Sequence, residues 1–93
     1  MKAVLVISER DNVATALEAL EPGRRIDAGG AFVVAIDPIP AGHKIALRPI
    51  GDGAAVVKYG SPIGTAVGDI AAGSHVHTHN VASNYLPTYT LPR

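Results

Sequence analysis

A short pattern that occurs four times constrains the fold more than any other feature of this sequence. In each copy an aliphatic residue is followed three positions later by glycine, and after three more positions by a second aliphatic residue. Glycine can adopt the positive φ angle of a tight turn, so each copy predicts a corner whose aliphatic residues enter the core. The unequal spacing of the copies argues against a solenoid. They are Leu20–Ile26, Ile39–Ile45, Ile50–Val56 and Ile70–Val76.

Composition favours a bent β structure with an aliphatic core. The chain has 93 residues, enough for one domain, and its 10 glycines and 7 prolines are too many for a helical bundle. Aromatic residues make up only 4% of the chain. The segment Ala31–Ile36 is apolar throughout, which predicts a central strand. Together with a first strand before Ser8, the expected strands are Ala31–Ile36, Lys44–Leu47, Ala54–Tyr59, Ile63–Val67 and Ser74–His79.

One short helix is expected near the N-terminus. Val13, Leu17 and Leu20 have the spacing of residues on one helix face, and Asp11 is a suitable N-cap. The fold class is therefore predicted as mainly β with one short helix, in a compact, strongly bent domain. This domain is expected over residues 1–81. Residues 82–93 lose the pattern and are expected to form a C-terminal tail or linker.

Charge and cysteine content exclude several functions. Eight basic and eight acidic side chains cancel, whereas binding to nucleic acid needs a basic excess, so we expect no nucleic-acid partner. Without cysteine there is no disulfide scaffold and no thiolate chemistry, which favours the cytoplasm. The apolar run at the N-terminus is too short for a signal peptide or a membrane span, so no membrane association is expected.

The segment His75–Asn80 carries three of the four histidines. On a strand His75, His77 and His79 project from the same face, where imidazoles can hold a divalent ion or transfer protons near neutral pH. The alternative is an exposed strand face that is merely rich in histidine. The fourth histidine, His43, follows the glycine of the second corner and joins the cluster if the second and fourth corners pack side by side. Otherwise it is a partly buried histidine bonded to a backbone carbonyl.

Four segments in this order resemble a known family. They are Asp11–Ala14, Gly42–Leu47, Lys58–Gly64 and Gly73–Asn80. Together they resemble the N-terminal SAF-type domain of the altronate and galactarate dehydratase family, and also the small subunit of sulfolactate sulfo-lyase. The resemblance covers about residues 4–81 and implies a β-clip, a compact and bent β fold.

The resemblance implies elimination of water, or of sulfite, β to a carboxylate. It also implies a divalent metal, first Fe²⁺ with Mn²⁺ or Zn²⁺ as alternatives, because a cation stabilises the negative charge that develops when the α proton leaves. Carried over by position, His43, Lys44 and His75 are catalytic candidates, and His77 and His79 are metal-ligand candidates. Substrate binding is assigned to Lys44 and Asn80, although solvated lysines are the commoner case.

The resemblance also implies a partner. In the dehydratases this domain precedes a much larger catalytic domain, so the chain is expected to be a small subunit or an excised domain, inactive alone. The expected partners are a large dehydratase-like subunit and a sugar-acid or hydroxy-acid substrate, and exposed strand edges make a homo-oligomer plausible. Two alternatives stay open: the small subunit of a sulfolactate sulfo-lyase, and a non-catalytic SAF-type module that binds sugar or protein.

Overall fold

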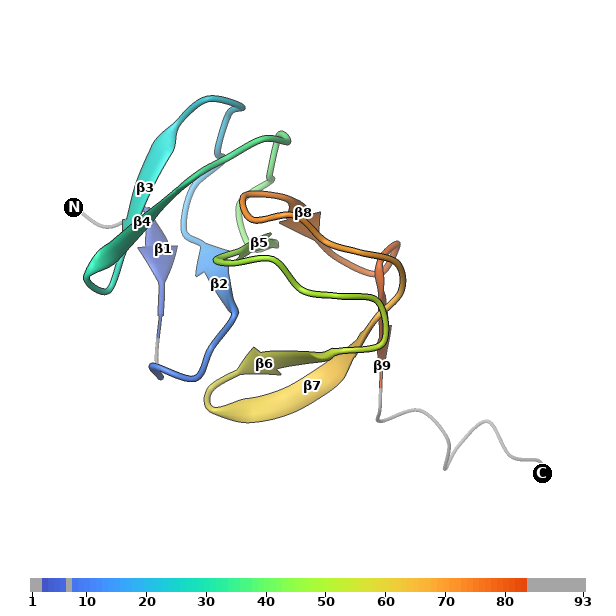
Figure 1. Ribbon diagram of the computed structural model, residues 1–93. Helices are drawn as coiled ribbons and strands as arrows, with labels where there is room; N and C mark the ends of the chain where they lie inside the picture. Colours follow the sequence, from blue (N-terminus) through green and yellow to red (C-terminus); the bar gives the residue numbers. More distant parts are fainter. Residues whose placement is uncertain (1–2, 7, 84–93) are drawn as a thin grey trace.

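The computed structural model describes residues 3–6 and 8–83, which form strands joined by tight turns (Figure 1). All strand pairs are antiparallel, in sheets with the orders β1-β2-β5-β8, β3-β4 and β6-β7-β9. The bent, mainly β architecture expected from the corners is therefore confirmed. The strands are β1 (Val4–Leu5), β2 (Val13–Ala16), β3 (Arg25–Ala28), β4 (Ala31–Val34), β5 (Lys44–Ala46), β6 (Ala55–Lys58), β7 (Ser61–Ala66), β8 (His75–Val76) and β9 (Val81–Ser83).

The backbone follows the same path twice. The first unit, residues 16–45, and the second unit, residues 46–76, each contain a corner, a hairpin and another corner. In the first unit Gly23 N–H donates to Ala35 O (2.7 Å); in the second, Gly53 N–H donates to Ala66 O (2.8 Å). The paired bridges Leu20–Ile39 and Ile50–Ile70 are likewise equivalent. A β-bulge in the β6–β7 pair, absent from β3–β4, contributes to the unequal spacing of the corners in the sequence.

Each unit has its own hydrophobic core, and the corner aliphatics fill it. The first core contains Leu20, Ile26, Ile39 and Ile45, and the second contains Ile50, Val56, Ile70 and Val76. All eight of these residues are at most 3% exposed, which confirms that both aliphatic positions of each corner point inward. Burying such side chains removes apolar surface from water and is the main favourable term in folding.

Strands β2 and β5 separate the two cores. On β2, Val13 packs into the second core and Ala14 into the first, while on β5 Ile45 packs into the first core and Ala46 into the second. In Figure 1 these two strands lie between the β3–β4 hairpin and the β6–β7 hairpin. Because both faces of β2 are covered, its sequence shows no alternation of polar and apolar residues.

The prediction of a short helix near the N-terminus is wrong. The described residues contain no helix, and Val13–Ala16 is strand β2, paired with β1 and β5. Asp11 does not cap a helix; its carboxylate accepts the backbone N–H groups of Gly60 (2.8 Å) and Ser8 (3.3 Å). Pairing on both sides and burial on both faces outweigh the weak helical spacing of a short segment.

The central position expected for Ala31–Ile36 is also wrong. Strand β4 (Ala31–Val34) pairs with β3 in a hairpin whose turn contains Gly29 and Gly30, both with positive φ. Phe32 and Val34 are exposed on its outer face. The Arg25 guanidinium lies 4.0 Å from the centroid of the Phe32 ring, and this contact covers part of that ring.

The domain extends slightly beyond the expected boundary at residue 81, because β9 runs from Val81 to Ser83 and pairs with β7. The rest of the expected tail, residues 84–93, lies outside the described residues. Within the described ranges there is no helix with the length and hydropathy needed to cross a membrane.

Candidate functional site

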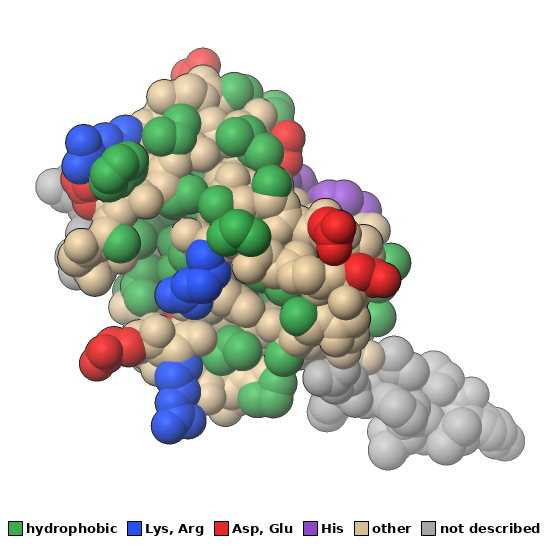
Figure 2. All heavy atoms as spheres, in the orientation of Figure 1, with side chains coloured by type: hydrophobic (Ala, Val, Ile, Leu, Met, Phe, Trp, Pro, Cys, Tyr) green, Lys and Arg blue, Asp and Glu red, His purple; other side chains and the backbone are tan. Residues whose placement is uncertain are grey.

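Two corners, one from each unit, meet at the histidine cluster. Strand β5 leaves the second corner and β8 leaves the fourth, and the two pair antiparallel with Ile45 opposite His75. Each corner is fixed by the same bonds: Gly42 N–H donates to Ala16 O and Gly73 N–H donates to Ala46 O, both at 2.8 Å. The side-by-side packing on which a role for His43 depended is therefore present. Figure 2 shows histidine side chains (purple) at one edge of the molecule.

The imidazole rings of His43, His75 and His77 stack. Ring centroids are 3.9 Å apart for His43 and His77, and 5.0 Å apart for His43 and His75, with interplanar angles of 15° and 23°. His43 Nδ1 and His75 Nε2 lie 2.8 Å apart, so one of these nitrogens donates its hydrogen and the other accepts. The tilted ring of His79 lies 5.2 Å from that of His75.

The chain turns back directly after Val76, so the expected strand Ser74–His79 is wrong beyond that residue. Strand β8 ends at Val76, and Asn80 N–H donates to His77 O (3.1 Å) to close a turn. The side chain of Asn80 also accepts a bond from His77 N–H. This side-chain bond gives the backbone an alternative to the ladder of a strand, as asparagine often does in turns.

The cluster disfavours protonation. The pKa of His75 is lowered from its ordinary value by burial and by repulsion from His43, His79 and His77, while Asp37 acts in the opposite direction. The pKa of His77 is lowered by partial loss of solvent, then by repulsion from His43 and Lys44. Neutral imidazole is the form that binds metal ions, and the lowered pKa values of His75 and His77 favour that form for these two rings.

Three of the histidines can hold one ion. Three ring nitrogens lie within 4.8 Å of one another, one from each of His43, His75 and His77. Two nitrogens that bind the same ion at about 2.0–2.1 Å are at most about 4.2 Å apart, so only small side-chain movements are needed. A set of three imidazoles suits Fe²⁺, Zn²⁺ or Mn²⁺ and leaves positions for water or substrate. The structure thus groups His77 with His43 and His75, and His79 is outside this set.

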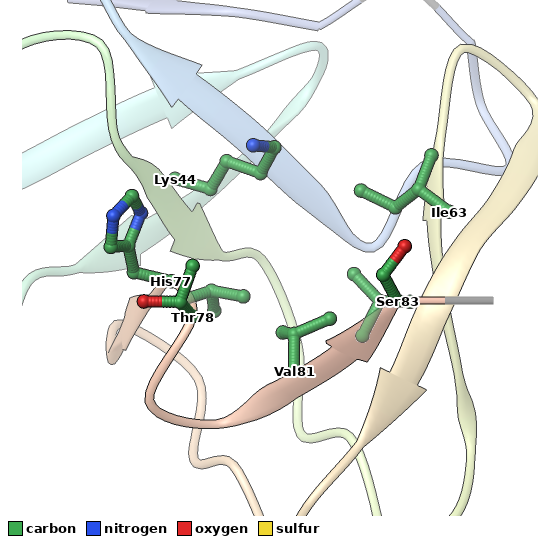
Figure 3. A pocket seen from close by; sticks show the side chains of 8 residues that line it. Lys44, Ile63, His77, Thr78, Val81 and Ser83 are labelled. Atoms are coloured by element: carbon green, nitrogen blue, oxygen red, sulfur yellow. The ribbon is translucent and has the colours of Figure 1, made fainter. Parts of the chain in front are cut away.

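A shallow pocket of about 190 Å³ lies beside the cluster (Figure 3). Lys44 and His77 form one side of it, and Ile63, Val81 and Ser83 lie across from them. Ligand pockets that enclose a small molecule are usually about 300–1,000 Å³, so this one encloses only part of a substrate. The lining residues are Lys44, Val56, Ile63, Val76, His77, Thr78, Val81 and Ser83.

The other sequence-based candidates lie around this centre. Lys44 follows His43 at the start of β5, and its charge contributes to the lowered pKa of His77. The Asn80 side chain contacts backbone groups of the cluster. Lys58 does not belong to this group: it is buried, with its ammonium 3.7 Å from the centroid of the Tyr59 ring, so it is not available to an anionic substrate.

Sequence reasoning missed Asp37. Its carboxylate accepts the backbone N–H of His75 (2.9 Å), which fixes the start of β8 against the loop before the second corner. A sequence signal existed, because an aspartate before the proline of a corner commonly bonds to backbone. That the partner is the backbone N–H of His75 depends on how the two units pair, and no local sequence pattern indicates this.

Comparison with known proteins identifies relatives of this chain. The altronate/galactarate dehydratase SAF domain model matches residues 2–84. Altronate dehydratase of Bacillus subtilis (strain 168) is 44% identical over 84 residues, which are 90% of this chain and 17% of that protein. Altronate dehydratase of Escherichia coli (strain K12) is 49% identical over 74 residues, 80% of this chain and 15% of that protein. The chain therefore spans about one sixth of the length of these dehydratases.

A second kind of relative is a separate subunit. The (2R)-sulfolactate sulfo-lyase subunit alpha of Paracoccus pantotrophus is 55% identical over 42 residues, which are 45% of this chain and 63% of that subunit. The match to the dehydratase domain covers all described strands and both corners of the histidine cluster. On this evidence the chain belongs to the altronate/galactarate dehydratase SAF-domain family.

Proposed function

We propose that this chain supplies part of the active site of a hydroxy-acid lyase, of the type that removes water from sugar acids. The observation that carries the proposal is the meeting of His43, His75 and His77 at the junction of two corners. The related full-length proteins named above are altronate dehydratases. An elimination next to a carboxylate needs groups that accept a proton and groups that stabilise negative charge, and a cluster of imidazoles beside a lysine supplies both kinds.

The proposal includes a divalent cation, Fe²⁺ first and Mn²⁺ or Zn²⁺ as alternatives, held by His43, His75 and His77. Such an ion, when bound, stabilises negative charge that develops on the substrate. Within the chain itself, the ring nitrogens of His43 and His75 lie within hydrogen-bond distance, and the lowered pKa of His75 favours its neutral form. Lys44, on the wall of the adjacent pocket, is suited to attract the carboxylate of the acid.

A larger catalytic unit is the proposed partner. The pocket beside the cluster is shallow and half of its lining residues are aliphatic, which does not match a polyhydroxy acid on its own. The relatives are either dehydratases several times longer than this chain or a subunit named alpha of a sulfo-lyase. We place the assembly in the cytoplasm, because a domain without cysteine depends on no disulfide in a reducing compartment.

The sulfo-lyase is the second candidate. The identity of 55% to a separate alpha subunit favours a role as the small subunit of an enzyme that acts on a sulfonated hydroxy acid. The two candidates use the same cluster and differ in the leaving group, water in one case and sulfite in the other. A non-catalytic module that binds sugar or protein is the third possibility, and it predicts no effect of the histidines on turnover.

Metal titration of the purified chain is the first test. We expect Fe²⁺ under anaerobic conditions, Mn²⁺ or Zn²⁺ to bind, and His43→Ala, His75→Ala and His77→Ala each to weaken binding about 100-fold or more, since each removes one of three ligands. The matched control is His79→Ala, which removes an imidazole outside this set and should change the affinity by less than about threefold. Binding that survives His75→Ala would contradict the assignment.

A domain exchange tests the reaction itself. In altronate dehydratase of Escherichia coli the matching segment is replaced by this chain, and the hybrid is assayed with altronate, galactarate and sulfolactate. Turnover that is retained in the hybrid and lost on His75→Ala supports the lyase role, and the preferred substrate separates the dehydratase from the sulfo-lyase. Full turnover with His75→Ala would favour the non-catalytic module.

A further inference from the structure

The second and fourth corners are followed by different structures, although the two corners are equivalent. After the second corner, β5 continues through Lys44–Ala46. After the fourth, β8 contains only His75–Val76, and the chain reverses over residues 77–80. This reversal places the His77 ring on that of His43, at 3.9 Å between centroids. The group that stabilises the reversal therefore decides whether the cluster forms.

Asn80 closes the reversal with both polar groups of its side chain. Its Oδ1 accepts the N–H of His77 (2.9 Å), and its Nδ2 donates to the carbonyl oxygen of His75 (3.0 Å). Its own backbone N–H donates to His77 O (3.1 Å), and its carbonyl accepts Val67 N–H (2.9 Å). The first three bonds close the histidine-bearing turn, and the fourth joins it to Val67, at the end of the β6–β7 hairpin.

The two histidines depend on Asn80 to different degrees. The backbone of His75 has a second anchor, because its N–H donates to the Asp37 carboxylate (2.9 Å), and its ring is within hydrogen-bond distance of His43. The His77 ring is exposed, and its backbone N–H and C=O both bond to Asn80. Loss of the Asn80 side chain should therefore release His77 first.

We propose that Asn80 is a positioning residue that holds the backbone of His75 and His77 so that their rings align with that of His43. The proposal rests on the proposed function of the cluster, and it gives Asn80 a role other than direct contact with substrate. Both of its side-chain groups are bonded to the backbone, which leaves one lone pair of Oδ1 and one N–H of Nδ2 for any other partner. Through its carbonyl, Asn80 also links the cluster to Val67, the residue after β7.

The chain offers a matched control in Asn12. The Asn12 side chain has the same bonding pattern: Oδ1 accepts Val57 N–H (2.7 Å) and Nδ2 donates to Ala55 O (2.9 Å), but these partners lie on β6. Replacing Asn12 by alanine removes two backbone bonds of the same kind without touching the histidine-bearing turn. A purely structural role for Asn80 predicts that both substitutions have similar consequences.

The experiment compares Asn80→Ala, Asn80→Asp and Asn12→Ala in the full chain, with Co²⁺ as the probe and its visible absorption as the readout. We expect Asn80→Ala to weaken Co²⁺ binding about 10–100-fold, the range seen when groups that orient metal ligands are removed. Asn80→Asp keeps an acceptor for His77 N–H but turns an oxygen toward the His75 carbonyl, so an intermediate loss is expected; this variant carries the test if the alanine variant does not fold. Asn12→Ala should bind Co²⁺ like the unsubstituted chain, even where it lowers the free energy of unfolding equally.

A metal-free readout separates this proposal from the proposed function. Nuclear Overhauser contacts between the rings of His43 and His77 should be present in the unsubstituted chain and in Asn12→Ala, and should weaken in both Asn80 variants. If the chain binds no metal but these contacts weaken as stated, the proposed metal site fails and the positioning role of Asn80 stands. Unchanged ring contacts and unchanged Co²⁺ affinity in the Asn80 variants would overturn it, as would equal losses in Asn12→Ala.

Discussion

The second corner, Ile39–Ile45, and the fourth corner, Ile70–Val76, are two copies of one structure with different chemistry. Their glycines have nearly the same φ, 86° for Gly42 and 87° for Gly73, and make equivalent backbone bonds. The aliphatic residues of both are buried. The histidines occupy positions that do not correspond: His43 directly follows its glycine, whereas His75 comes one residue later. The repeated backbone thus positions the site, and its chemistry comes from the positions at which the copies differ.

The surroundings of the two corners differ as well. Nothing lies within 4 Å of where a Cβ on Gly42 would be, whereas a Cβ on Gly73 would lie 2.0 Å from the carbonyl oxygen of Val34. Gly73 also accepts a bond from Ile36 N–H (3.0 Å). At Gly73 the fourth corner is therefore packed against the first unit, whereas the corresponding side of Gly42 is open. This contact joins the two units next to the histidine cluster.

The largest effect is expected from alanine at the packed corner. Gly73→Ala combines an unfavourable positive φ with a backbone clash, and should destabilise the fold by more than about 4 kcal/mol. Gly42→Ala has only the φ penalty and should cost about 1–2 kcal/mol. Urea unfolding monitored by circular dichroism measures both. Equal losses for the two variants would show that the corners have equivalent surroundings, contrary to the structure.

The second prediction uses equivalent residues in the two cores. Ile39→Ala and Ile70→Ala remove side chains that are 1% and 3% exposed and that occupy the same place in the two units, so each should cost about 2–5 kcal/mol. A matched surface control is Leu17→Ala, because Leu17 is 53% exposed and its replacement should change stability by at most about 0.5 kcal/mol.

The same variants test whether the units unfold together. Strands β2 and β5 contribute side chains to both cores, so either core substitution should shift a single cooperative transition. Two separate transitions, or a loss in one core that leaves the other at its original stability, would show that the units are independent.

The corners could be predicted from the sequence because their signal is local. A glycine with aliphatic residues three positions on either side reports both the turn and the buried side chains, and all four copies behave as expected. Strand β2 could not be recognised in this way. Val13 and Ala14 point into opposite cores, which removes the alternation that marks a strand, and the remaining spacing resembled a helix.

The histidine cluster was predictable in its members but not in its geometry. The alternation His75, His77, His79 indicated a strand, yet the chain reverses after Val76, where Asn80 bonds to the backbone, and His79 is outside the set of three histidines whose nitrogens converge. The role of His43 depends on the pairing of β5 with β8, which is long-range and leaves no local trace. The nearly equivalent positions of His43 and His75, one and two residues after a corner glycine, were the only sequence sign of that pairing.

The smallest expected effect concerns pH. The folded chain lowers the pKa of His75 below its ordinary value of 6.5, first through burial and then through repulsion from neighbouring histidines, so the folded state binds a proton there less readily than the unfolded state. The resulting stability is fully present above about pH 6.5 and is lost as the pH falls through the lowered pKa. His77 acts in the same direction.

The free energy of unfolding of the metal-free chain should therefore fall between pH 7.5 and 5.5, and His75→Gln should make that fall shallower, because glutamine does not titrate. Lys44, the residue opposite Val76 in the paired strand, adds repulsion on His77, so Lys44→Gln should reduce the fall slightly. An identical pH dependence in the unsubstituted chain and in His75→Gln would contradict this prediction. It would mean that the neighbouring rings do not disfavour protonation of His75, so that placing a histidine in each of the two corners does not make the stability of the fold depend on pH.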